Sequence, residues 1–84
     1  MTYFVYILEC ANKALYTGIT TDLKRRLEEH KTGKGGNYTR YNPGKKICYF
    51  EKHPNRSLAT KREAEIKKWP RAKKLELSTS TKMT

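Results

Sequence analysis

The chain has 84 residues, of which 19 are Lys or Arg and eight are Asp or Glu, so its formal net charge is +11. This length corresponds to one small domain and leaves no room for a separate cofactor-binding domain. No apolar stretch approaches the ~20 residues of a transmembrane helix, and residues 1–8 lack the features of a signal peptide. We therefore expect a cytoplasmic protein without membrane contacts.

The first strand is expected at residues 3–9, which are aromatic and β-branched and predict a strand buried on both faces. After a polar turn at residues 11–14, residues 15–19 return as the second strand of a hairpin. Gly18, near the end of that strand, allows either a positive φ or a close approach to the backbone. A third strand is expected at residues 47–51.

The first helix is expected at residues 23–31. Residues 20–22 are Thr-Thr-Asp and offer three successive N-caps for it. Arg26 and His30 are four positions apart, so they share one face of this helix.

The second helix begins at a cap supplied by Asn55 or Ser57 and ends at Trp69, because Pro70 cannot continue it. Its expected core residues are Leu58, Ile66 and Trp69. A short amphipathic piece follows, and residues 78–84 are expected to form a disordered polar tail.

These elements predict a fold of the α/β (α+β) class for a single domain over residues 1–77. Their order is β-β-α-β-α, with or without a third helix at the end. A three-stranded, mainly antiparallel sheet flanked by two or three helices is the architecture that suits this order.

The charge is unevenly distributed along the chain. Residues 1–22 hold one basic and two acidic side chains, whereas residues 23–84 hold eighteen basic and six acidic ones. Such a basic surface attracts polyanions and releases counterions when it binds them. We therefore expect a nucleic-acid partner, with solubility alone as the simpler explanation of the charge.

A long loop is expected at residues 32–46, and a loop of this length in a small domain is usually functional or mobile. Glycines, basic residues and tyrosines alternate in it, so it suits backbone contacts to phosphates and stacking on bases. The nucleic-acid contacts expected there are Lys34, Tyr38, Arg40 and Tyr41. A flexible connection with ordinary turn chemistry is the alternative.

The two cysteines, Cys10 and Cys48, are too few for a disulfide scaffold. Neither has a further Cys or a His at metal-binding spacing. We interpret them as reduced thiols of a cytosolic protein.

Two tripeptides and three later residues resemble the signature of the GIY-YIG nuclease superfamily, in particular its small standalone bacterial members. The first tripeptide is Phe4-Val5-Tyr6 and the second is Tyr16-Thr17-Gly18. The later residues are Arg26, His30 and Glu63. Each tripeptide alone is a weak match, but the order of the whole set in a short basic chain is specific. The chain departs from the family pattern at Phe4, where the family has Gly.

The resemblance implies hydrolysis of a DNA phosphodiester with a single Mg²⁺ or Mn²⁺ ion, in DNA repair or processing. It assigns metal binding to Glu63 and the stabilisation of phosphoryl oxygens to Arg26, whose guanidinium pairs with them bidentately. It assigns the role of general base to Tyr6, oriented by Tyr16 or His30. A water polarised by His30 is the alternative.

Glu63 rather than Glu65 is the expected metal ligand, because Glu65 points about 200° away from it on the helix. A salt bridge with a neighbouring lysine is the simpler role for Glu63. Gly18 and the helix residues Lys67 and Lys68 complete the expected nucleic-acid contacts.

The positive net charge is also compatible with two other functions. A nucleic-acid-binding module with little or no catalysis needs no metal, and a standalone domain makes few specificity contacts. Such a domain is expected to obtain its substrate specificity from a protein partner. A basic RNA- or ribosome-associated protein is the third hypothesis.

Overall fold

The structure is a computed structural model and describes residues 1–34 and 43–80. Its elements in chain order are β1 (Tyr3–Cys10), β2 (Leu15–Thr20), α1 (Leu23–Lys31), β3 (Gly44–His53), α3 (Arg56–Lys67) and α4 (Arg71–Ser80). The predicted α+β class and the predicted element order, with the third helix present, are confirmed.

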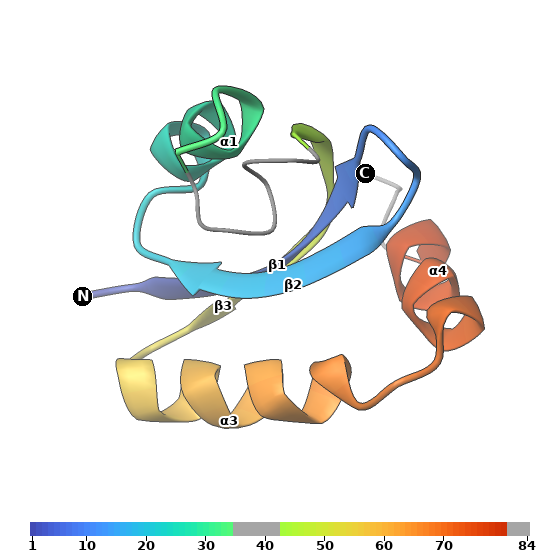
Figure 1. The fold of residues 1–84 in the computed structure, drawn as a ribbon. Helices are drawn as coiled ribbons and strands as arrows, with labels where there is room; N and C mark the ends of the chain where they lie inside the picture. Colours follow the sequence, from blue (N-terminus) through green and yellow to red (C-terminus); the bar gives the residue numbers. More distant parts are fainter. Residues whose placement is uncertain (35–42, 81–84) are drawn as a thin grey trace.

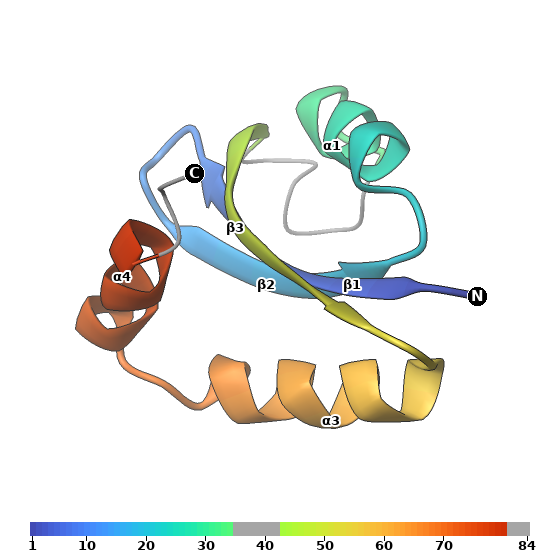
Figure 2. The same cartoon turned by 180° about the vertical axis from the view of Figure 1, so that it is seen from behind.

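The three strands form one antiparallel sheet in the order β2-β1-β3. Helix α1 lies on one face of this sheet, and α3 and α4 lie on the other (Figures 1 and 2). Because β1 is the central strand, both of its faces are covered, and the side chains of residues 5–8 are all fully buried. This confirms the prediction that the first strand is buried on both sides.

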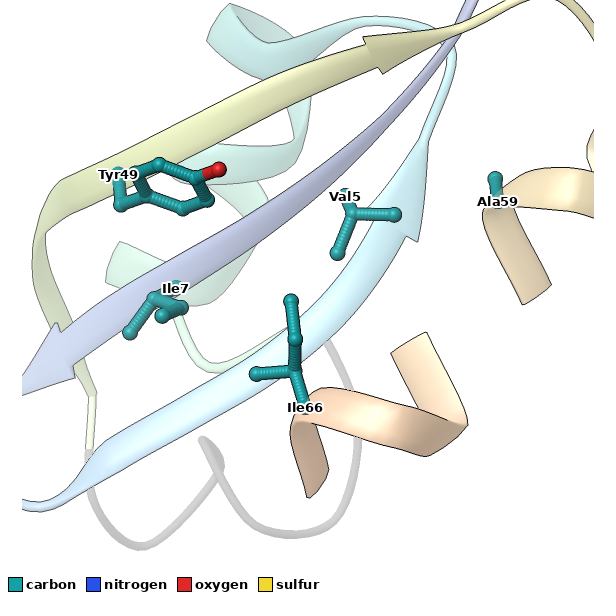
Figure 3. Close-up of a cluster of buried hydrophobic side chains, with 5 residues drawn as sticks. All are labelled: Val5, Ile7, Tyr49, Ala59 and Ile66. Atoms are coloured by element: carbon teal, nitrogen blue, oxygen red, sulfur yellow. The ribbon is translucent and has the colours of Figure 1, made fainter. Parts of the chain in front are cut away.

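The core under α3 contains apolar side chains from both layers: Val5, Ile7, Tyr49, Ala59 and Ile66 (Figure 3). Each fully buried aliphatic side chain contributes about 1.5–3 kcal/mol relative to an exposed one. Leu58 was expected in this core but is 44% exposed. That prediction is wrong. Helix α3 packs on the sheet with the face that carries Ala59, and Leu58 lies about 100° around the helix from Ala59.

Helices α1 and α3 begin at side-chain caps. The Asp22 carboxylate accepts a hydrogen bond from the Arg25 N–H at 3.0 Å, and Asn55 Oδ1 accepts one from the Leu58 N–H at 2.9 Å. Each cap satisfies one of the backbone donors that the first turn of a helix leaves unpaired. Asp22, the last of the three candidate caps, therefore fixes where α1 begins.

Several boundaries differ from the sequence-based expectation. The strands β1, β2 and β3 end one, one and two residues later than expected, at Cys10, Thr20 and His53. Strand β3 begins at Gly44 rather than at residue 47, because Gly44 pairs with Cys10. A side chain at Gly44 would place its Cβ only 2.8 Å from a Leu8 methyl group, so a bare Cα is required. Helix α3 ends at Lys67, two residues early. Helix α4 extends to Ser80, beyond the expected start of the polar tail at residue 78.

Cys10 and Cys48 are free thiols. None of the helices in the described part of the chain has both the length and the apolar character that a membrane span needs.

Candidate active site

The centre of the candidate site is the hydroxyl group of Tyr6, on β1. Its oxygen lies 2.8 Å from Nε2 of His30, in the last turn of α1. Nε of Arg26, one turn earlier in the same helix, donates to the same oxygen at 3.4 Å. Tyr6 and His30 are fully buried, so the fold brings these residues together beneath α1.

The donors and acceptors at this point favour one arrangement of protons. Arg26 can only donate, so the Tyr6 oxygen accepts from it and keeps its own proton for another partner. Nε2 of a neutral His30 with its proton on Nδ1 is that partner. The Tyr6 hydroxyl then donates to His30 while it accepts from Arg26.

Burial controls the protonation of both groups. It raises the pKa of Tyr6 to about 12, although the Arg26 guanidinium acts in the opposite direction. It also lowers the pKa of His30, and the positive charge of Arg26 lowers it further. Both side chains are therefore neutral at neutral pH, as the proton arrangement above requires.

Gly18 makes room for the Tyr6 side chain. It lies opposite Tyr6 in the β1–β2 register, and a Cβ at this position would lie 2.7 Å from the Tyr6 oxygen. Of the two roles expected for Gly18, the structure shows the close approach, which is made by the phenol ring of Tyr6. Gly18 is buried, and its contact with nucleic acid stays a prediction.

Tyr16, on β2, completes an aromatic cluster around the site. The centroid of its ring lies 5.2 Å from that of His30 in an edge-on arrangement and 6.5 Å from that of Tyr6. These separations are typical of favourable aromatic pairs. Tyr16 therefore helps to fix the orientation of the His30 ring.

Arg26 is held between the buried pair and a carboxylate. Its side chain is 28% exposed, and its Nη1 lies 2.9 Å from Oε1 of Glu29. Glu29 is a site neighbour that the sequence analysis missed, although its i,i+3 spacing from Arg26 is the signal for such a pair. The neighbouring Arg25 is exposed and lies 3.9 Å from the other oxygen of Glu29.

Glu63 belongs to α3, which packs on the opposite face of the sheet from α1 (Figures 1 and 2). Its side chain is 19% exposed and its Oε2 lies 3.1 Å from Nζ of Lys67, which is the salt bridge that the simpler interpretation predicted. Its negative charge is one of the minor influences that raise the pKa of Tyr6. Glu65, by contrast, is 59% exposed.

The donor set for a metal at Glu63 is small, because α3 lies across the sheet from the helix that carries Arg26 and His30. Residues 1–34 and 43–80 contain no group of three Cys, His, Asp or Glu side chains able to hold a metal ion together. Mg²⁺ is commonly bound by one or two carboxylates, with waters and substrate phosphate oxygens as its other ligands. Glu63 fits such a one-carboxylate site, with Lys67 as the competitor for its carboxylate.

The expected nucleic-acid contacts are scattered. Lys34, just beyond α1, is exposed, as are Lys67 and Lys68 at the end of α3. The other three expected contacts lie outside the described residues: Tyr38, Arg40 and Tyr41.

Comparisons with known proteins identify the family of the chain. The GIY-YIG catalytic domain model matches residues 2–76. A UPF0213 protein of Haloquadratum walsbyi is 46% identical over 76 residues, which cover 90% of this chain and 85% of the relative. A UPF0213 protein of Syntrophus aciditrophicus is 48% identical over 75 residues, covering 88% and 86% of the two chains.

A solved structure has the same fold. The solution NMR structure of a UPF0213 protein from Bacillus halodurans superimposes with a TM-score of 0.60 at 39% sequence identity. The match covers 96% of this chain and 86% of the other. The extent of the domain match and the identity to these UPF0213 proteins show that the chain belongs to the GIY-YIG family.

Proposed function

We propose that this chain is a divalent-metal-dependent endonuclease that hydrolyses DNA phosphodiester bonds during DNA repair or processing in the cytoplasm. The observation that supports this proposal most is the meeting of Arg26 and His30 at the Tyr6 hydroxyl. The three groups together can bind an anion and move a proton, which are the two tasks of phosphodiester hydrolysis.

Arg26 binds the scissile phosphate in this proposal. Its guanidinium is partly exposed and already engaged with the carboxylate of Glu29, so a phosphate can replace Glu29 as its anionic partner. Charge-assisted bonds from a guanidinium to phosphate oxygens are about twice as strong as neutral hydrogen bonds. Arg26 therefore stabilises the negative charge that accumulates on the phosphoryl oxygens.

Tyr6 and His30 act as a proton relay. The raised pKa of Tyr6 means that its phenol does not ionise by itself near neutral pH. When Nε2 of His30 takes the phenolic proton, the Tyr6 oxygen takes a proton from the attacking water. Direct polarisation of the water by His30 is the alternative route.

Glu63 is the residue that would hold Mg²⁺ or Mn²⁺. A bound ion would supply Lewis-acid stabilisation of the charge on the leaving oxygen. Lys67 must release the Glu63 carboxylate for this to happen.

The test uses the purified full chain with branched, nicked, single-stranded and duplex DNA, with Mg²⁺, with Mn²⁺ and with a chelator. We expect metal-dependent cleavage that Glu63→Gln and Arg26→Ala abolish. Matched controls are Glu65→Gln and Arg25→Ala, which alter the more exposed neighbours on the same helices. Cleavage that survives both site variants would exclude the assigned site.

A nucleic-acid-binding module without catalysis is the second candidate. The observation that favours it is the 3.1 Å ion pair of Glu63 with Lys67, which already satisfies the carboxylate. This candidate predicts salt-sensitive binding without turnover on any substrate, and unchanged affinity in Glu63→Gln. Competition with RNA of equal length identifies an RNA-binding protein. Co-purification from cells identifies a protein partner that supplies specificity.

A further inference from the structure

A partly exposed aromatic pair lies on the same sheet face as the candidate site. Phe4 and Phe50 stack with their ring centroids 6.0 Å apart and their planes 28° apart. Phe50 lies opposite Tyr6 in the β1–β3 register, so the two side chains project from the same face of the sheet. Phe50 is nevertheless 45% exposed, and Phe4 occupies the position where the family pattern has Gly.

Phe50 also forms part of an open apolar groove of about 680 Å³ between α1 and β3. This volume is within the range of small-molecule binding sites. The lining residues are Leu23, Lys24, Leu27, Ile47, Cys48, Tyr49 and Phe50. Lys24 is the one charged residue in this described lining, and it is basic. The groove thus combines an aromatic surface with a positive charge at its side.

We propose, building on the nuclease function above, that this groove binds an unpaired nucleobase of the substrate by stacking on Phe50. A base carries a flat apolar face that an exposed aromatic ring accepts, and the phosphates on either side of it suit Lys24. Lys52, opposite Phe4 in the register and exposed, is a second basic residue beside the aromatic pair. The substrate class is therefore DNA with single-stranded or flapped segments rather than continuous duplex.

The position of the groove relative to the site supports the same occupant. Gly18, Tyr6 and Phe50 form one row across the three strands. The Tyr6 hydroxyl lies over Gly18, about two strand spacings or ~10 Å from Phe50. Successive nucleotides rise about 3.4 Å each in a stacked strand. A strand with its phosphate at Arg26 therefore reaches Phe50 within a few nucleotides.

Duplex DNA offers no base that can bind in this groove, because its bases are already stacked and paired. Stacking of one unpaired base on an aromatic side chain changes affinity by about 5- to 150-fold. The preference for unpaired bases is therefore large enough to measure in one variant.

The test is binding of fluorescent single-stranded and duplex oligonucleotides of equal length, in a chelator so that cleavage plays no part. Phe50→Ala should weaken single-strand binding about 5- to 150-fold and leave duplex binding unchanged. The control is Leu58→Ala, which removes an equally exposed apolar side chain, 44% against 45%, from the opposite face. Phe50→Tyr should bind as the parent does, and Phe50→Leu should bind as Phe50→Ala does.

Three results would overturn the inference. One is equal affinity of Phe50→Ala and the parent for single strands. Another is full binding by Phe50→Leu, which would mean that apolar volume and not an aromatic face is needed. The third is self-association of the parent that Phe50→Ala abolishes, which would identify a second copy as the occupant.

The outcome is separable from that of the nuclease proposal. If no DNA is cleaved but Phe50→Ala selectively weakens single-strand binding, the nuclease proposal is wrong and the base-binding groove is supported. If duplex and single strands are cleaved at equal rates and Phe50→Ala binds normally, the base-binding role of the groove is wrong and the nuclease proposal stands.

Discussion

The hydroxyl oxygen of Tyr6 and Nε2 of His30 lie 2.8 Å apart in a fully buried position, although the residues are 24 positions apart in the sequence. The bond ties the central strand to the last turn of α1. Each group satisfies the polar atom of the other, which would otherwise be costly to bury. The same bond thus contributes to stability and to the proposed proton transfer.

Tyr6→Phe should separate these two contributions. The variant leaves Nε2 of His30 without its phenol partner, so we expect the free energy of unfolding to fall by about 1–3 kcal/mol. Cleavage should fall by about 10²- to 10⁴-fold, the usual contribution of acid–base catalysis. Urea unfolding and cleavage rates at saturating DNA measure the two effects. A folded Tyr6→Phe protein with normal cleavage would contradict the relay.

Stability should decrease as the pH falls through the titration range of His30. An unfolded His has a pKa near ~6.5, whereas burial lowers the pKa of His30 in the fold. Below about pH 6.5 the unfolded chain therefore binds more protons than the folded one, and stability is lost until the folded pKa is passed. The slope cannot exceed about 1.4 kcal/mol per pH unit for one group.

His30→Gln provides the control for this pH effect, because it removes the titration between about pH 6.5 and the folded pKa. Burial acts to raise the pKa of Glu51, but hydrogen bonds from Tyr49, His53 and Arg62 hold it below the ordinary value of 4.5. The stability that ionised Glu51 contributes is therefore lost at a lower pH than the stability that depends on neutral His30. An unchanged pH profile in His30→Gln would show that His30 does not titrate as described.

Gly18→Ala should damage the site through Tyr6. The added methyl group would lie 2.7 Å from the Tyr6 oxygen and 2.9 Å from Cζ, so the phenol must move away from His30 and Arg26. We expect a loss of about 1–3 kcal/mol of stability together with reduced cleavage. The double variant Gly18→Ala/Tyr6→Phe should lose less than the sum of the two single variants, because the closest overlap is gone. Strict additivity would rule out this mechanism.

Glu29→Gln should strengthen DNA binding. Removing the carboxylate frees Arg26 from its 2.9 Å ion pair, so a phosphate no longer competes with Glu29. Because partly exposed ion pairs contribute at most about 1 kcal/mol, the gain in affinity should be about 5-fold or less. Glu28→Gln changes the net charge equally at an exposed position of the same helix. Equal gains in both variants would assign the effect to net charge alone.

The sequence by itself determined the local structure and the chemical composition of the site. Aromatic and β-branched residues predicted β1, and the candidate caps at residues 20–22 and at Asn55 or Ser57 placed the starts of α1 and α3 to within a few residues, because these signals act over a few neighbouring residues. The choice between Glu63 and Glu65 also followed from helix periodicity, and the structure places Glu63 nearer the core.

Tertiary structure alone decided which of these residues meet. The contact of Tyr6 with His30, the exposure of Leu58 and the stacking of Phe4 on Phe50 depend on strand register and helix packing. No local pattern encodes such contacts, because they join residues far apart in the chain. The sequence thus predicted a basic domain with the residues of a nuclease, and only packing placed His30 in the core and left Phe50 at the surface.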